Sequence, residues 1–164
     1  MAKFAVAAKA LRGPFRKLIH TLELKVRRVV IKVHPKAAAR YADSAKHADT
    51  ALKAARADAA KLRAEMTKTP TATSAAVDRT TGRVVGIGHS KHTTTLPAEL
   101  VAKLPDPPPE KRWSVTNCGE IEAASKAMDA GSRFEDLVIR TVRTESGVLF
   151  PPCQNCDYWL PGKD

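Results

Sequence analysis

Cysteine is scarce in this chain, whose 164 residues contain three cysteines. Three thiols cannot all pair, which argues against the disulfide framework that stabilises many small secreted domains. Since two of the three are spaced as C-x-x-C, they favour a metal site or thiol chemistry in a reducing compartment. We therefore expect the protein to act in a cytoplasm.

Long apolar runs are also lacking. Lys9 and Arg12 interrupt the N-terminal segment before it reaches the length of a signal peptide or a membrane span. We expect neither of these, so a secreted effector would need another route into the cytosol of a target cell. The content of 43% hydrophobic and 27% charged residues is typical of a globular protein.

Acidic residues are scarce only in the first half of the chain. Residues 1–70 contain 17 Lys and Arg against 5 Asp and Glu, and residues 71–164 contain 11 against 12. The composition changes at the same place, from a segment rich in Ala, Lys and Arg to one that contains Gly, Pro and Thr. We predict a basic helical segment at 1–70 and a second domain at 71–164, with the boundary at 67–74.

Two helices are predicted in the first half from apolar residues at three- and four-residue steps. The first covers about 14–34, although its β-branched residues also suit a strand at 25–33. The second runs through 35–66, and its apolar seam needs a partner. An α-helical hairpin and helix-mediated self-association both satisfy this need. The basic faces suit nucleic acid, an anionic membrane, or solvent and docking.

The second half has the pattern of a small α/β domain. We expect a β-hairpin, then a helix, a strand and a last helix. Gly86-Ile87-Gly88 lacks the following helix of a nucleotide-binding turn and indicates close backbone packing. The predicted segments are strands at 73–78, 83–88 and 137–142, a hairpin turn at 79–82, a short helix within 93–104, an extended loop at 105–109, and helices at 118–131 and 153–160.

The chemistry is concentrated in Cys118-Gly119-Glu120 and Pro152-Cys153-Gln154-Asn155-Cys156. Cysteines three apart in the first turn of a helix share a face, where free amide groups favour the thiolate form. A tetrahedral zinc with three thiolate ligands keeps its fourth position for water, as catalytic sites do. Glu120 is placed to move protons as a general acid and base. A structural zinc with His89 or His92 as fourth ligand, and a redox dithiol, are the alternatives.

Cys-x-Glu followed by Pro-Cys-x-x-Cys resembles the cytidine deaminase superfamily. Residues 117–125 look most like the YwqJ-like deaminase domains of bacterial polymorphic toxins, and the similarity covers about 74–160. The resemblance implies an α/β/α deaminase fold and a hydrolase that converts cytosine to uracil in single-stranded DNA or RNA, with an immunity protein as partner. It assigns Cys118, Cys153 and Cys156 as Zn²⁺ ligands and Glu120 as the catalytic residue.

Weaker assignments surround these four residues. The resemblance implies that the amide of Gly119 orients the attacking water and that Pro152 shapes the loop beneath the base. We expect Trp113 to stack on the base. His89 is either a surface polar residue after its strand or a residue at the mouth of the pocket. Because aromatic residues make up only 5% of the chain, packing is the competing role for most of them. The alternatives for function are an adenosine or free-nucleotide deaminase, or a non-enzymatic module whose basic helices bind nucleic acid.

Two departures from the deaminase pattern carry expectations. Cys118 stands where many relatives have histidine, so the metal with three thiolates has a formal charge of −1 and needs compensation from the helix N-termini or from an arginine, with Arg112, Arg140 and Arg143 as candidates. Only eight residues follow Cys156. The sheet therefore stops early, and another chain or the segment 25–33 is expected to fill its edge unless three strands suffice.

Overall fold

The structure is a computed structural model that describes residues 35–91, 93–109 and 112–161, with side chains from Asp43 on. Contacts divide the chain into two units, Met1–Asp43 and Ser44–Asp164. The helix predicted at 14–34, and with it the hairpin and the alternative strand at 25–33, lies outside the described residues.

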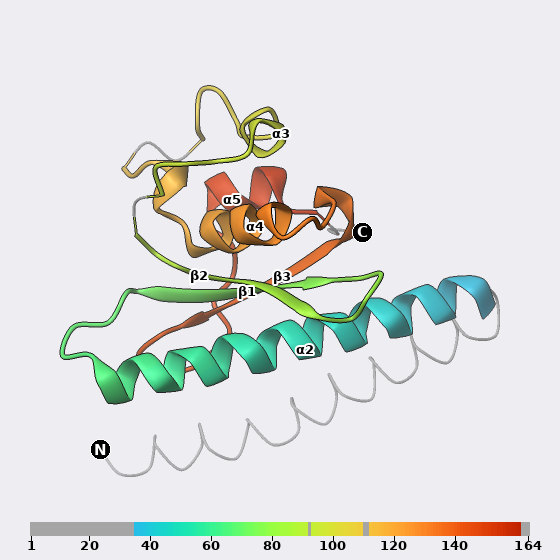
Figure 1. Cartoon of the computed structure of the whole chain (residues 1–164), viewed down its shortest axis with the longest axis horizontal. Helices are drawn as coiled ribbons and strands as arrows, with labels where there is room; N and C mark the ends of the chain where they lie inside the picture. Colours follow the sequence, from blue (N-terminus) through green and yellow to red (C-terminus); the bar gives the residue numbers. More distant parts are fainter. Residues whose placement is uncertain (1–34, 92, 110–111, 162–164) are drawn as a thin grey trace, which may run out of the picture. The chain divides into compact units, whose positions relative to one another are not determined.

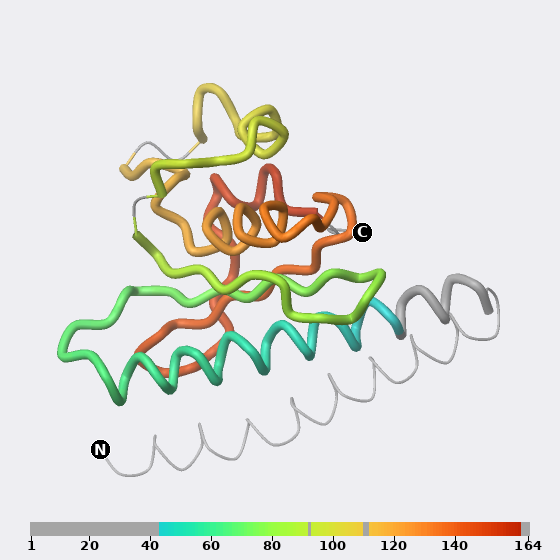
Figure 2. The backbone as a smooth tube through the Cα atoms, viewed as in Figure 1, coloured from blue at the N-terminus to red at the C-terminus, as the bar shows by residue number. Residues whose placement is uncertain are grey.

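A mixed α/β fold is formed by the described residues, with four α-helices and one three-stranded antiparallel sheet (Figures 1 and 2). The strands and the helices that flank the cysteines lie within two residues of their predicted bounds, and the short helix lies inside its predicted range. The helices are α2 (Pro35–Glu65), α3 (Ala98–Val101), α4 (Gly119–Asp129) and α5 (Gln154–Trp159), and the strands are β1 (Ala72–Asp78), β2 (Val84–His89) and β3 (Leu137–Arg143).

The sheet has the order β2-β1-β3, and β1 pairs antiparallel with both neighbours. The hairpin turn between β1 and β2 is confirmed. Asp78 Oδ1 accepts hydrogen bonds from the backbone N–H of Thr80 at 2.8 Å and of Thr81 at 3.1 Å. Gly82 closes the turn with a φ of 68°, which favours glycine. This hairpin fixes the pairing of β2 with β1, and β2 in turn packs against α4.

The sheet has one hydrophobic core on each face, because successive side chains of a strand point to opposite sides. Ala76 belongs to the cluster formed with α4 and α5. Its neighbour Ala75 packs with Ala55 and Ala59 of α2 on the other face. From Ser44 on, α2 therefore covers one side of the sheet, and α4 and α5 cover the other (Figure 1). This part of α2 therefore shares a hydrophobic core with the sheet. The division into 1–70 and 71–164 stays a prediction.

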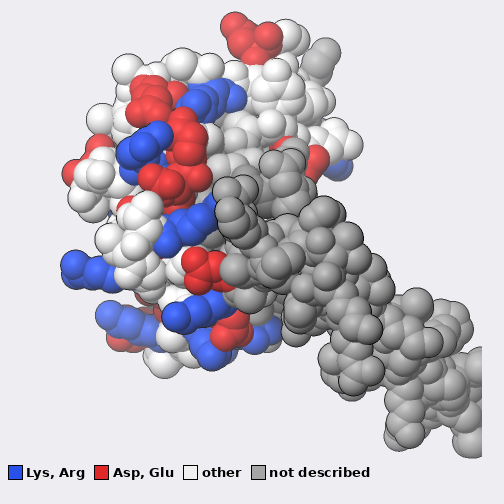
Figure 3. Space-filling view, turned by 90° about the vertical axis from the view of Figure 1, so that its right-hand side faces the viewer, with Lys and Arg blue, Asp and Glu red and all other residues white. Residues whose placement is uncertain are grey.

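Basic residues of α2 help to dock it. Arg56 Nε donates to the Gly147 carbonyl at 3.1 Å, and Arg63 donates to the Thr144 carbonyl. Both acceptors lie in the loop after β3. On the face of the described residues seen in Figure 3, Lys and Arg side chains lie among Asp and Glu side chains. Docking on the loop after β3 therefore accounts for two of the basic side chains of α2. No helix in the described part of the chain is both long and apolar enough to cross a membrane.

The outer edge of β3 is partly covered by the chain that follows it. The backbone N–H of Phe150 donates to the Thr141 carbonyl at 2.9 Å, and Val142 forms an isolated bridge with Leu149. The segment thus folds back along the end of β3 before it enters α5. This return brings the loop before Cys153 to the same end of the sheet as the start of α4.

Close backbone packing at Gly86 and Gly88 is confirmed. A Cβ atom on Gly86 would lie 2.1 Å from the Ala123 carbonyl oxygen, and one on Gly88 would lie 2.2 Å from the Gly119 carbonyl oxygen. Real side chains do not occupy such distances, so α4 approaches β2 closely only because both positions lack side chains. The contact fixes the first turn of α4 against the end of β2.

We predict that Gly88→Ala lowers the free energy of unfolding by about 2–3 kcal/mol, because the added methyl group must push α4 away from β2. Denaturant unfolding measures this change. Val84→Ala, on the same strand and 41% exposed, is the control and should have little effect. Equal stability of Gly88→Ala and the control would contradict the close packing.

Candidate metal centre and pocket

Three cysteines from two helix starts meet at one point. Cys118 is the N-cap residue of α4, Cys153 is the N-cap residue of α5, and Cys156 follows one turn later. Their Sγ atoms lie within 4.8 Å of one another, with 3.5 Å between Cys118 and Cys153. In a tetrahedral zinc–thiolate site the sulfurs are about 3.8 Å apart, so the three thiols fit a metal ion. They are consistent with zinc without being specific to it.

The three thiols hold their protons unequally. Hydrogen bonds from Cys118 and then Cys156, aided by the backbone N–H groups of Cys156 and Asn155, lower the pKa of Cys153 to about 2. The pKa of Cys118 rises to about 12, chiefly because its thiol donates to Cys153. Donation to the other two sulfurs and burial raise the pKa of Cys156 as well. At neutral pH one thiolate, on Cys153, therefore stands beside two thiols that a metal ion would deprotonate.

A buried carboxyl group lies beside this cluster. Glu120, in the first turn of α4, is 6% exposed, and its Oε1 accepts a hydrogen bond from Thr141 Oγ1 at 2.9 Å. The register of the sheet sets Ser74 opposite Thr141, and their hydroxyl oxygens are 2.8 Å apart. Burial raises the pKa of Glu120, while the bonds from Thr141 and Cys156 oppose this in part. The sheet therefore holds and orients this buried carboxyl group through Thr141.

Sequence reasoning missed Ser74 and Thr141, which it placed in strands without a role. Alternation along each strand places Ser74 and Thr141 on the same face as Ala76 and Ile139, where they are polar residues in an otherwise apolar row. Only the pairing of β1 with β3 shows that the two hydroxyls meet under Glu120. The sheet thus supplies the contacts that orient the carboxyl group.

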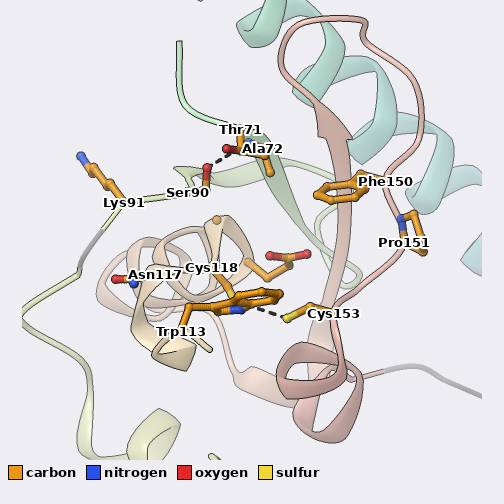
Figure 4. A pocket seen from close by; sticks show the side chains of 12 residues that line it. Thr71, Ala72, Ser90, Lys91, Trp113, Asn117, Cys118, Phe150, Pro151 and Cys153 are labelled. Carbon is orange, nitrogen blue, oxygen red and sulfur yellow. Dashed lines mark hydrogen bonds between the residues drawn. The ribbon is translucent and has the colours of Figure 1, made fainter. Parts of the chain in front are cut away.

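A cavity of about 550 Å³ opens beside the cysteines and Glu120 (Figure 4). Cys118 and Cys153 belong to its wall, as do the rings of Trp113 and Phe150. The volume lies within the usual range for small-molecule sites. The residues around it are Thr71, Ala72, Ser90, Lys91, Trp113, Asn117, Cys118, Gly119, Glu120, Phe150, Pro151 and Cys153.

Two of the weaker site assignments fall on the cavity. Gly119 lines it, and so does Trp113, whose side chain is 38% exposed. The backbone carbonyl of Trp113 accepts a hydrogen bond at 3.4 Å from Asn155, which is fully buried between two of the cysteines. Pro152 is not among the lining residues, and Pro151 takes that place.

His89 does not lie at the pocket mouth, contrary to expectation. Its ring Nε2 is 2.7 Å from Asp58 Oδ2 of α2. Side chains alternate along β2, so His89 points to the α2 face because Gly86 and Gly88 face α4. His89 is therefore not placed to be a fourth metal ligand. The metal-ligand cluster formed within the described ranges contains the three cysteines alone, and His92 lies outside those ranges.

The structure shows contacts for each of the three arginines expected to compensate the thiolates, and the compensation itself stays a prediction. Arg140 donates to the carbonyl of the preceding residue. Arg143 lies 4.4 Å from the centre of the Phe150 ring, and Arg112 lies 5.0 Å from the centre of the Trp113 ring. Each of the two aromatic rings of the cavity thus has a guanidinium group over one of its faces. Besides the bonds from the other two cysteines, the backbone N–H groups of Asn155 and Cys156 at the start of α5 stabilise the Cys153 thiolate.

Comparisons with protein-family models, curated proteins and solved structures give no match to this chain.

We predict that the protein binds one Zn²⁺ per chain and releases about two protons at pH 7, because Cys118 and Cys156 are protonated before binding and Cys153 is not. Calorimetry in buffers of different ionisation enthalpy measures the proton release. Replacing any of the three cysteines with serine should weaken binding at least tenfold, while His89→Ala should not. Loss of binding in His89→Ala would show that a histidine completes the site.

We also predict that Glu120→Gln stabilises the metal-free protein at pH 8. A carboxyl group whose pKa is raised on folding favours the folded state fully below its ordinary pKa of 4.5, and this contribution is lost as the pH rises through the folded pKa. The difference in unfolding free energy between Glu120→Gln and wild type should therefore grow with pH from below 4 to 8. A difference that does not change with pH would contradict the burial of an ionisable group at this position.

Proposed function

We propose that this chain is a zinc-dependent nucleobase deaminase that converts cytosine to uracil in single-stranded nucleic acid and acts as a bacterial toxin or effector. The observation that carries the proposal is the position of Glu120, a buried carboxyl group beside three clustered thiols on the wall of an open cavity. Structural zinc sites have four protein ligands and need no such carboxyl group. Three ligands beside an acid are the arrangement of a hydrolytic site.

Zinc fits this centre because its three thiols provide a negative, sulfur-rich ligand set. Cys118, Cys153 and Cys156 would hold the ion and leave its fourth position to solvent. When bound, zinc supplies a Lewis acid that lowers the pKa of water. The amide groups at the starts of α4 and α5 stabilise the negative sulfurs.

Glu120 carries the proton transfers. Hydrolysis of the cytosine amine consumes one water and releases ammonia, so a proton must leave the attacking water, reach the ring nitrogen and then reach the departing amine. A buried carboxyl group with a raised pKa can serve each of these transfers. Thr141, itself hydrogen-bonded to Ser74, keeps the carboxyl group oriented toward the reacting atoms.

The cavity suits a planar base. Trp113 and Phe150 offer ring faces for stacking, which is the usual means of holding an unpaired base. The backbone of Gly119 is exposed to the same cavity beside Cys118. An immunity protein that covers this opening would block access to it, and it is the partner that a toxin requires.

We predict that purified, zinc-loaded protein produces uracil in a cytosine-containing single-stranded oligonucleotide, read by sequencing or mass spectrometry. Glu120→Gln should lower kcat at least 100-fold while the zinc content stays at one per chain, since the proton carrier is lost and the ligands are not. Glu135→Gln is the control, because Glu135 is an exposed carboxylate that pairs with Lys103.

Inosine as product in place of uracil would keep the deaminase chemistry and change the base. No product from DNA, RNA or free nucleosides at full zinc occupancy would contradict the proposal and favour the non-enzymatic module.

A further inference from the structure

We propose that Lys91 binds a phosphate group of the nucleic-acid strand whose base occupies the cavity, and that Glu122 positions this lysine. The inference rests on the proposed function and names the contact that holds the strand. Lys91 is the one Lys or Arg among the residues that line the cavity in the described part of the chain. It lies two residues after the end of β2, and its side chain is 60% exposed. Its ammonium group is therefore accessible to an anion from solvent.

The backbone that leads to Lys91 is fixed from two sides. The N–H of His89 donates to Glu122 Oε2 at 2.7 Å. The N–H of Ser90 donates to the Ala72 carbonyl at 2.9 Å, and the Ala72 N–H donates back to the Ser90 hydroxyl at 2.9 Å. The His89 ring is in turn bonded to Asp58 of α2. Lys91 therefore extends from a rigid point at the rim, which lowers the conformational cost of binding.

Glu122 sets the direction of the lysine side chain. The Glu122 side chain is only 8% exposed, and its Oε1 lies 3.1 Å from Lys91 Nζ and 3.0 Å from Lys126 Nζ. A buried carboxylate needs such partners, and Glu122 has two lysines as well as the His89 N–H. The ammonium group of Lys91 has three N–H donors, so it can bind a phosphate while it stays paired with Glu122. Binding therefore leaves no buried charge unpaired, and the first turn of α4 stays in place.

The charge distribution of the cavity indicates an anion at this position rather than at the centre. The cavity is lined by the Glu120 carboxyl group and two of the cysteine sulfurs, none of which attracts an anion, and by the aromatic rings of its apolar walls. A base stacked between the walls would carry its phosphates outside the cavity, where Lys91 stands at the rim. Contacts of lysine with phosphates are the general source of affinity for single strands and make binding depend on salt.

Lys126 provides a matched control. It pairs with the same oxygen of Glu122 as Lys91 does and is similarly exposed, at 50%, but it does not line the cavity. Binding of a fluorescent, cytosine-containing single-stranded oligonucleotide is measured by anisotropy at several salt concentrations, on zinc-loaded protein. All variants are made in the Glu120→Gln background so that the oligonucleotide is not consumed.

We expect Lys91→Ala to weaken binding about 3- to 10-fold and to reduce the slope of log K against log salt by about 0.7, as for the loss of one phosphate contact on a single strand. Lys126→Ala should bind like its parent. Glu122→Gln should weaken binding as well, and Lys91→Ala should then add nothing beyond its own effect, because the two residues act as one unit. In the active protein Lys91→Ala should raise KM for the oligonucleotide and leave kcat within about twofold.

Unchanged binding in Lys91→Ala, an equal loss in Lys126→Ala, or no saturable binding by the parent would overturn the proposal. Additive effects of Glu122→Gln and Lys91→Ala would remove the positioning role of Glu122. Lys91-dependent binding without any deamination by the wild-type protein would contradict the proposed function and leave the phosphate contact standing. Deamination with a KM that does not depend on Lys91 would support the proposed function and overturn the phosphate contact.

Discussion

The close contact between α4 and β2 is the constraint on which the site depends. Gly86 and Gly88 allow the backbone of α4 to lie against the strand, and a side chain at either position would separate the two elements. This contact places the first turn of α4 above the centre of the sheet, where the hydroxyl groups of Ser74 and Thr141 meet. Glu120 reaches those hydroxyls only from this position. The same contact brings Cys118 to the end of the sheet where the segment after β3 returns with Cys153.

The electrostatics of the site follow from this crowding. A carboxyl group and three thiols share a small volume, so each added negative charge raises the cost of the next one. The pKa of Cys153 is lowered, whereas the pKa values of Cys118, Cys156 and Glu120 are raised. A divalent cation held by the three thiols would relieve this repulsion. Lys91, which lines the cavity, and the guanidinium groups of Arg112 and Arg143 over the aromatic rings add positive charge nearby.

The cysteine cluster, the hairpin and the glycine packing could be predicted from the sequence because each depends on short-range spacing. Cys-x-Glu and Cys-x-x-Cys at helix starts place their side chains on known faces, and Gly86-Ile87-Gly88 has few other uses within a strand. Thr141 and His89 could not be placed in this way. Their roles depend on which face of a strand meets α4 and which meets α2, and this is decided by the pairing of distant segments. Phe150 was missed for the same reason, since it reaches the cavity through the return of the chain along β3.

The central claim is that three thiolates hold a metal ion whose fourth position is open beside Glu120. X-ray absorption spectroscopy of the zinc-loaded protein at neutral pH tests this most directly, because it counts the ligands and gives their distances. The account predicts three sulfur ligands at about 2.3 Å and one oxygen ligand at about 2.0 Å. The oxygen shell should persist in Glu120→Gln, since the carboxyl group stands beside the ion without binding it. Four sulfur ligands, or three sulfurs with an imidazole ligand, would show a closed structural site and contradict the account.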